Sequence, residues 1–193
     1  MEDGLLEEAL RTLVAGDEER REEAAITLGR FGAAALEPLD ALTGSHEADT
    51  RWWAARALAE VGGEGAVASL VHVLEDADAD VRACACLALG RMGATSAALA
   101  LAARLADESA FVAGIAADGL SMLGEGALPA LVPMLRHERP GVRLLAVRAL
   151  DRIGSQQAVE PLCSVLEDPS YLVSRLALEA LEKLGVGMVY FSP

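Results

Sequence analysis

The stretch DADADVRACACLALGRMG, which begins at Asp76, carries carboxylates at a spacing that calcium sites use. Asp76, Asp78 and Asp80 match the first three ligand positions of an EF-hand loop, where alternating oxygens surround a hard cation. The sixth position of that loop needs a glycine for its sharp turn, and it holds Val81. The twelfth needs a bidentate glutamate, and it holds Leu87. The sequence therefore lacks two features of a calcium loop.

Two thiols in the same stretch, Cys84 and Cys86, raise the alternative of a thiolate metal site. Structural zinc sites draw four ligands from paired turns, and this chain has only Cys163 besides these two. If the segment is helical, residues two apart point about 200° apart around the axis. We therefore expect these cysteines neither to pair nor to share a metal.

Catalytic signatures are absent elsewhere in the sequence. The histidines, His46, His72 and His137, are too far apart in the chain to form a cluster by spacing. No G-x-S-x-G, H-E-x-x-H, C-x-x-C or phosphate-cradling loop occurs. We therefore expect no cofactor, no metal and, as the favoured interpretation, no enzymatic activity, although missing motifs leave catalysis open.

The composition favours an all-helical protein. Apolar residues make up 53% of the 193 residues but aromatic residues only 4%, so the core is built from Ala, Leu and Val. The formal net charge of −14 repels phosphate backbones and anionic membranes, which makes nucleic acid an unlikely partner. No run of 18 apolar residues occurs, and the N-terminus is acidic. Together with unpaired cysteine spacings, these features predict a cytoplasmic protein without membrane attachment.

Internal repetition is the strongest signal in the sequence. Six glycines recur every 30 or 31 residues: Gly32, Gly62, Gly93, Gly124, Gly154 and Gly185. A leucine stands four residues before each: Leu28, Leu58, Leu89, Leu120, Leu150 and Leu181. An alanine stands eight before each: Ala24, Ala54, Ala85, Ala116, Ala146 and Ala177. Steps of three and four residues mark one helical face, so each unit is predicted to be a helix, a glycine turn and a second helix.

One domain of stacked units is therefore expected over residues 1–193. Its parts are a half-repeat, five repeats and a second half-repeat with a tail: 1–16, 17–44, 45–75, 76–106, 107–136, 137–167 and 168–193. The acidic links between units suit helix N-termini, where side-chain oxygens cap the helix and the macrodipole favours negative charge. This predicts that DADAD is a link between repeats.

The unit D-x-x-x-x-V-R-x-x-A-x-x-A-L-G-x-x-G, followed by A-V-x-P-L, resembles the short HEAT-like repeat of the phycobilin-lyase-type proteins. Residues 76–93 match it best, and 142–154 repeat most of it. The resemblance implies a right-handed α-solenoid, or superhelix of stacked helix pairs, with about five and a half HEAT-like repeats. For function it implies a protein-interaction scaffold or adaptor, with a bilin lyase or tetrapyrrole-handling protein as the alternative.

Four arginines stand eleven residues before their glycines: Arg21, Arg51, Arg82 and Arg143. The resemblance implies that they join a ladder with the link aspartates, and phosphate binding is the alternative, since a buried arginine needs an anionic partner. The arginine is replaced at Ala113 and Ser174. Asp107 and Asp168 thus keep the acid and lose the base, and we expect these joints to be less regular or to have other partners.

The resemblance also places the second helices on a concave, partner-binding surface. Their predicted outward residues are Glu37, Pro38, Ala41, Ala68, Ser69, His72, Leu99, Ala100, Ala103, Pro129, Ala130, Pro133, Glu160, Pro161 and Ser164. The nine central ones, from Ala68 to Pro133, are the predicted binding residues. None is basic and most are small or apolar, which suits a partner helix or peptide. Tight curvature alone would also explain the small residues.

The two tryptophans are adjacent, so on a helix they point in different directions. Trp53 aligns with apolar residues in the other repeats and is predicted to lie in the core. Trp52 aligns with no consistent chemistry, and partial exposure would make it an interface anchor or a residue packed at an edge. It belongs to a first helix, away from the predicted concave surface.

The predicted half-repeats leave apolar surface to cover. After Gly185 the chain continues into a tail with Met188, Val189, Tyr190 and Phe191. Either this tail folds over the last helix or another chain covers it. The second alternative is the hypothesis of self-association through this end.

Overall fold

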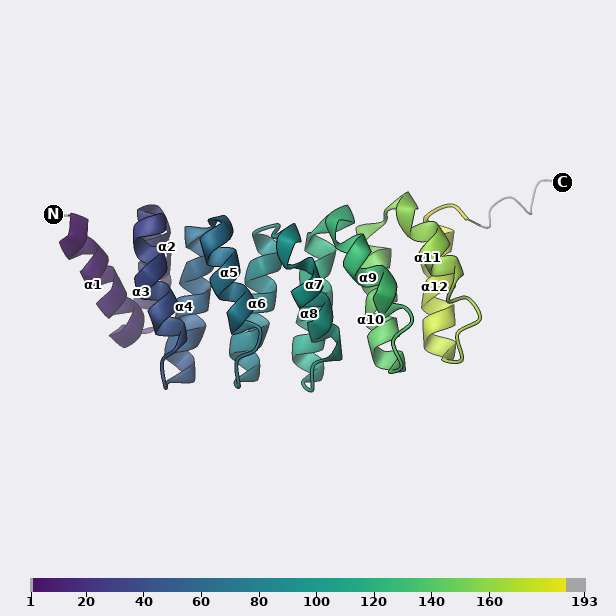
Figure 1. Cartoon of the computed structure of the whole chain (residues 1–193), viewed down its shortest axis with the longest axis horizontal. Helices are drawn as coiled ribbons and strands as arrows, with labels where there is room; N and C mark the ends of the chain where they lie inside the picture. The colour runs from purple at the N-terminus through teal and green to yellow at the C-terminus, as the bar shows by residue number, and fades with distance from the viewer. Residues whose placement is uncertain (1, 187–193) are drawn as a thin grey trace. The chain divides into compact units, whose positions relative to one another are not determined.

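A computed structural model describes residues 2–186, which form twelve α-helices and, within that range, no strand (Figure 1). The helices group into two compact units, one ending at Ala97 and one beginning at Ala98. In the described range no helix is long and apolar enough to cross a membrane. The prediction of an all-helical chain is confirmed.

The first unit stacks helices in two layers. It contains α1 (Glu2–Ala15), α2 (Glu18–Phe31), α3 (Ala33–Thr43), α4 (Ala48–Val61), α5 (Gly63–Val73) and α6 (Ala79–Arg91). The first helices of successive repeats, α2, α4 and α6, contact one another, while α3 and α5 form the second layer in front of them in Figure 1. Each helix thus buries one face against its own repeat and one against the next.

The second unit repeats the pattern with shorter second helices. It contains α7 (Ala98–Ala103), α8 (Ala110–Met122), α9 (Leu128–Met134), α10 (Pro140–Ile153), α11 (Val159–Cys163) and α12 (Tyr171–Lys183). Turns of 3-10 helix, such as Gly124–Ala127 and Gln156–Ala158, precede α9 and α11. Here α8, α10 and α12 contact one another in order.

Each glycine of the repeat ends a first helix with a backbone conformation that side chains disfavour. All six have positive φ, as predicted, and Gly154 is fully left-handed at φ 65° and ψ 23°. Its N–H donates to the carbonyl of Leu150 at 3.1 Å, which satisfies a carbonyl of the last turn. Glycine adopts this geometry without the cost that a Cβ imposes.

The core is built from alanine and leucine at the repeated positions. The six alanines eight residues before the glycines are all buried, and the six leucines four residues before them are at most 2% exposed. Small side chains let the helix backbones approach closely, and the leucines fill the remaining volume at native packing density. The sequence period therefore corresponds directly to the buried face of each first helix.

Candidate partner-binding surfaces

The acidic stretch around Asp78 forms a helix cap, as predicted. The carboxylate of Asp78 accepts hydrogen bonds from the N–H groups of Asp80 (2.9 Å) and Val81 (3.2 Å) at the start of α6. Asp76 accepts from the N–H of Asp78 at 2.8 Å and so shapes the link itself. Among the described residues no three His, Cys, Asp or Glu side chains are arranged to hold a metal ion.

Arg51 connects two repeats through the carboxylate of Asp76. Its Nε and Nη2 each donate to Asp76 at 2.7 Å, the bidentate geometry that planar guanidinium groups favour. Its Nη1 donates to the carbonyls of Ser45 and His46 in the preceding link, at 3.0 and 3.2 Å. Burial raises the pKa of Asp76, but the hydrogen bond and charge of Arg51, the N–H of Asp78 and the charge of Arg82 together outweigh burial, so the pKa is lowered. The ladder predicted by resemblance is present at this joint.

Arg143 makes the same connection to Asp168 in the second unit. Nε and Nη2 donate at 2.7 and 2.8 Å, and Nη1 donates to the carbonyls of His137 and Glu138. Because the repeat of Asp168 carries Ser174 in place of arginine, we expected this joint to be less regular or to have another partner. The second alternative holds, because the base is Arg143 of the preceding repeat, which reaches forward to the next link as Arg51 does.

The first joint of the ladder differs from the others. Arg21 forms an ion pair with Asp49, which lies in the first turn of α4 rather than in the link. Its Nη2 also donates to the carbonyl of Val14 at 2.9 Å. The link position that corresponds to Asp76 holds Ser45, so the arginine finds its carboxylate four residues further on.

In the first unit the predicted binding residues divide between surface and core. Ala68 and His72 of α5 are exposed, as expected. Ser69 is 9% exposed, and its hydroxyl donates to Asp40 of α3 at 2.6 Å. Its outward assignment is corrected because this hydrogen bond ties α5 to α3. Ser69 therefore supports the surface without forming part of it.

In the second unit four of the predicted residues form an exposed set on two contacting helices, α7 and α9. Leu99 is 74% exposed, the largest exposure among the large apolar side chains of the described chain, and Ala103, Pro129 and Pro133 are exposed with it. Ala100 is half-buried. Ala130 is only 2% exposed and packs inward, which corrects its outward assignment. We name the set Leu99, Ala103, Pro129 and Pro133 the second-helix surface.

The two tryptophans occupy the environments predicted for them. Trp53 is 7% exposed, and the guanidinium of Arg21 lies 6.0 Å from the centroid of its ring. Trp52 is half-buried and meets Trp53 edge to face, with ring centroids 4.9 Å apart. Trp52 therefore presents part of its ring on the side of the first helices.

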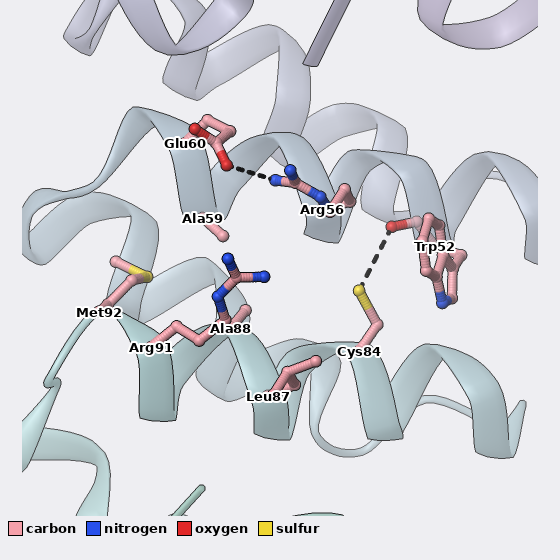
Figure 2. A pocket seen from close by; sticks show the side chains of 9 residues that line it. All are labelled: Trp52, Arg56, Ala59, Glu60, Cys84, Leu87, Ala88, Arg91 and Met92. Carbon is pink, nitrogen blue, oxygen red and sulfur yellow. Dashed lines mark hydrogen bonds and ion pairs between the residues drawn. The ribbon is translucent and has the colours of Figure 1, made fainter. Parts of the chain in front are cut away.

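A pocket between α4 and α6 was missed by the sequence analysis. It has a volume of about 410 Å³ and is lined on α4 by Trp52, Arg56, Ala59 and Glu60. On the other side it is lined by Cys84, Leu87, Ala88 and Arg91 of α6 and by Met92, which follows that helix, as Figure 2 shows. We name it the α4–α6 pocket. The sequence does carry a signal for this pocket. The bulky Trp52 is followed, about two helix turns later on the same helix, by the small Ala59.

The three cysteines, all in the described chain, are not joined in disulfides. Cys84 lies in the α4–α6 pocket, 3.8 Å from the carbonyl oxygen of Trp52, and burial raises the pKa of its thiol to about 12. Cys86 is fully buried, whereas Cys163 is exposed. Burial disfavours the thiolate, the reactive form of cysteine, so we assign Cys84 as a packing residue.

The last described helix exposes apolar side chains. On α12, Tyr171, Leu172 and Leu178 are 68%, 61% and 49% exposed. The tail from Met188 to Phe191, on which the prediction of self-association depends, lies outside the described residues.

Helix pairs of 30 or 31 residues, stacked through buried alanines and joined by arginine–aspartate pairs, define an α-solenoid. HEAT repeats match residues 3–80, 37–121, 67–141 and 128–187, so the chain belongs to the HEAT repeat family. No curated protein matches the sequence significantly.

Several solved structures share the fold. The complex of CpcE and CpcF of phycocyanin lyase from Nostoc sp. PCC7120 is 27% identical, with 93% of this chain and 77% of that chain covered and a TM-score of 0.52. An archaeal HEAT-like repeats protein from Thermococcus onnurineus is 17% identical over 93% of this chain and 80% of that one, with a TM-score of 0.61. A designed armadillo repeat protein in complex with the peptide (KR)4 is 20% identical, covers 93% and 99%, and has a TM-score of 0.50.

Proposed function

We propose that the chain is a non-catalytic scaffold or adaptor that binds a helix or peptide of a protein partner on its second helices. The observation that carries this proposal is the exposure of Leu99, at 74%, beside the exposed Ala103, Pro129 and Pro133. A large apolar side chain surrounded by small and proline residues gains free energy when a partner covers it. The four residues carry no charge, so they favour an apolar partner face over a nucleic acid.

The fold reduces the cost of such binding. Both helices that carry the second-helix surface are anchored by buried leucines, Leu101 on α7 and Leu131 on α9, each 0% exposed. A preformed surface loses little conformational entropy when a partner docks. The designed armadillo repeat protein illustrates that stacked helices of this fold class can hold a peptide. The acidic charge and the unpaired cysteine spacings support a cytoplasmic place of action.

The test is a pull-down from the host's lysate with the wild type and with a variant carrying Leu99→Glu and Ala103→Glu. A matched control carries Met122→Glu and Ala110→Glu, which places the same charges at exposed positions of the first helix α8. Circular dichroism and urea unfolding establish that all three fold. We expect the partner to be captured by the wild type and the control and lost by the second-helix variant. Equal capture by all three contradicts the proposal.

A second candidate function is that of a bilin lyase or tetrapyrrole-handling protein. It is favoured by the 27% identity to the phycocyanin lyase complex over 93% of this chain. It is weakened because no residue of the described chain has a chemical role that we can assign. Mixing the protein with a linear tetrapyrrole tests it directly. A new visible absorbance band that grows with protein concentration supports this candidate, and an unchanged spectrum contradicts it.

A further inference from the structure

The α4–α6 pocket places an uncompensated positive charge beside an apolar wall. Arg56 is already neutralised, because it pairs with Glu22 of α2 and with Glu60 at 2.6 Å. Arg91 is exposed and points from α6 across the pocket towards Ala59 (Figure 2). Glu60 lines the same pocket, but its carboxylate pairs with Arg56, and in the described chain no ion pair joins a carboxylate to Arg91. Within residues 2–186, Arg30 and Arg136 also lack an ion pair, but of these three arginines only Arg91 lines the α4–α6 pocket.

Two repeats of the second unit pair the cation at the position of Arg91 with an acidic side chain. Arg91, Arg152 and Lys183 each stand two residues before the glycine of their repeat. In the second unit, Lys183 pairs with Asp151 of the preceding first helix at 2.7 Å, and Arg152 pairs with Asp118. These pairs fasten neighbouring first helices together.

At the α4–α6 joint both acid positions are occupied by other residues. The position of Asp151, three before the glycine, holds Ala59, and the position of Asp118, six before it, holds Arg56. The carboxylate that compensates the cation elsewhere is therefore absent, and the space that it would take is part of the pocket. The empty space of the pocket therefore lies beside Arg91, which has no ion pair in the described chain.

The rest of the pocket is suited to an apolar group. The ring of Trp52 forms one end, and Leu87, which is 36% exposed, and Met92 line the α6 side. An aromatic ring and a thioether adapt well to a large apolar side chain of a partner. The cation lies within the same pocket, so one ligand must satisfy both.

We propose that the α4–α6 pocket binds a peptide segment of a partner protein in which an aspartate or glutamate stands next to a large apolar side chain. The carboxylate takes the position of the missing acid and pairs with Arg91, while the apolar side chain packs on Trp52, Leu87 and Met92. The site lies on the first helices of the first unit and is independent of the second-helix surface. A charge-assisted pair in a partly desolvated pocket gives both affinity and choice of partner.

The probes are three capped hexapeptides with one phenylalanine next to a glutamate, a glutamine or a lysine, and serine and alanine elsewhere. Binding is followed through the indole N–H signal of Trp52 in nuclear magnetic resonance titrations. We expect the wild type to bind the glutamate peptide about threefold more tightly than the glutamine peptide, the effect of one charged pair at an exposed arginine. Equal binding of the two overturns the proposal.

Three variants examine the role of the cation. Arg91→Gln should remove the preference for glutamate, and Arg91→Glu should transfer it to the lysine peptide. Ala59→Asp supplies the missing acid within the chain, so it should weaken binding of the glutamate peptide about threefold while leaving the free energy of unfolding unchanged or higher. A glutamate preference that survives Arg91→Gln or Ala59→Asp contradicts the proposal.

The controls separate this site from general charge effects. Arg136→Gln removes an exposed arginine from the second unit and should leave the preference intact. Inorganic phosphate at the same ionic strength should not displace the glutamate peptide, since it offers nothing to the apolar wall. Displacement by phosphate would show a plain anion site and overturn the peptide proposal.

Discussion

Arg143 holds Asp168 of the next repeat through two parallel hydrogen bonds of 2.7 and 2.8 Å. The remaining nitrogen of the same guanidinium, Nη1, donates to two carbonyls of the link before its own helix. One side chain therefore fixes a link and joins it to the following repeat. Arg51 and Asp76 show the same geometry in the first unit, so the same arginine–aspartate pair joins adjacent repeats in both places.

Replacing Asp168 with asparagine should lower the free energy of unfolding by roughly 1–3 kcal/mol at pH 7, because a buried charged hydrogen bond is lost. The hydrogen bond from Arg143 lowers the pKa of Asp168 below its usual 3.8. The stabilisation is thus complete above the pKa of the unfolded chain and is lost as pH falls through the lower folded value. Urea unfolding at pH 7 and in steps below pH 4 checks this.

The control for this variant is Glu179→Gln, which removes a carboxylate paired with Arg175 on the exposed side of α12. Exposed pairs contribute little, so this change should have a small effect at either pH. A similar loss for both variants would show that Asp168 has no special role in joining the repeats.

Replacing Gly154 with alanine should destabilise the second unit by about 1–2 kcal/mol, because a Cβ is strained in left-handed geometry. Gly114 is the matched control: it lies inside α8, has no left-handed φ, and a Cβ there would meet no atom within 4 Å. Alanine at 114 should stabilise by up to about 1 kcal/mol through its helix propensity. Opposite signs in thermal unfolding support the turn assignment, and equal signs contradict it.

Replacing Trp53 with alanine should cost about 3–5 kcal/mol, as expected for a large aromatic side chain removed from a core. Trp52→Ala should cost clearly less, because Trp52 is only half-buried. Urea unfolding followed by circular dichroism measures both without relying on tryptophan fluorescence. If Trp52→Ala proves as damaging as Trp53→Ala, Trp52 is a core residue and not a surface available to a partner.

The three cysteines should differ in reactivity. Cys163 is exposed and should be alkylated first by iodoacetamide at pH 8. Cys84, whose thiol pKa is raised to about 12, and the fully buried Cys86 should stay unmodified in the folded protein. Peptide mass spectrometry over time gives the order. Rapid modification of Cys84 in the folded protein would contradict its assignment as a packing residue.

Leu178 of α12 is predicted to take part in self-association. The residues at the corresponding position of the other repeats are all buried: Ala25, Ala55, Cys86, Ala117 and Val147. Leu178 is 49% exposed, so a second copy that covered it would bury apolar surface. Leu178→Glu, or deletion of residues 186–193, should lower the mean mass in sedimentation equilibrium. An unchanged monomer before and after either change would refute self-association through this end.

Much of the fold could be predicted from the sequence because the repeated residues act locally. The glycine spacing predicted where each first helix ends, and the alanines and leucines predicted which face is buried. The candidate surface was predicted less well. Four of its residues are exposed as expected: Leu99, Ala103, Pro129 and Pro133. Ser69 and Ala130 are buried, because the packing of each second helix against its neighbour decides which of two adjacent positions faces outward.

The sequence by itself determined the repeat, the helical class and the core, since a 30- or 31-residue period with one apolar face leaves few alternatives. Tertiary structure decided which side chains meet between repeats. That Asp168 pairs with Arg143, 25 residues before it, and that Arg91 faces Ala59 both follow from how adjacent helices are staggered. Stagger depends on packing of whole helix faces, and no local spacing in the sequence encodes it.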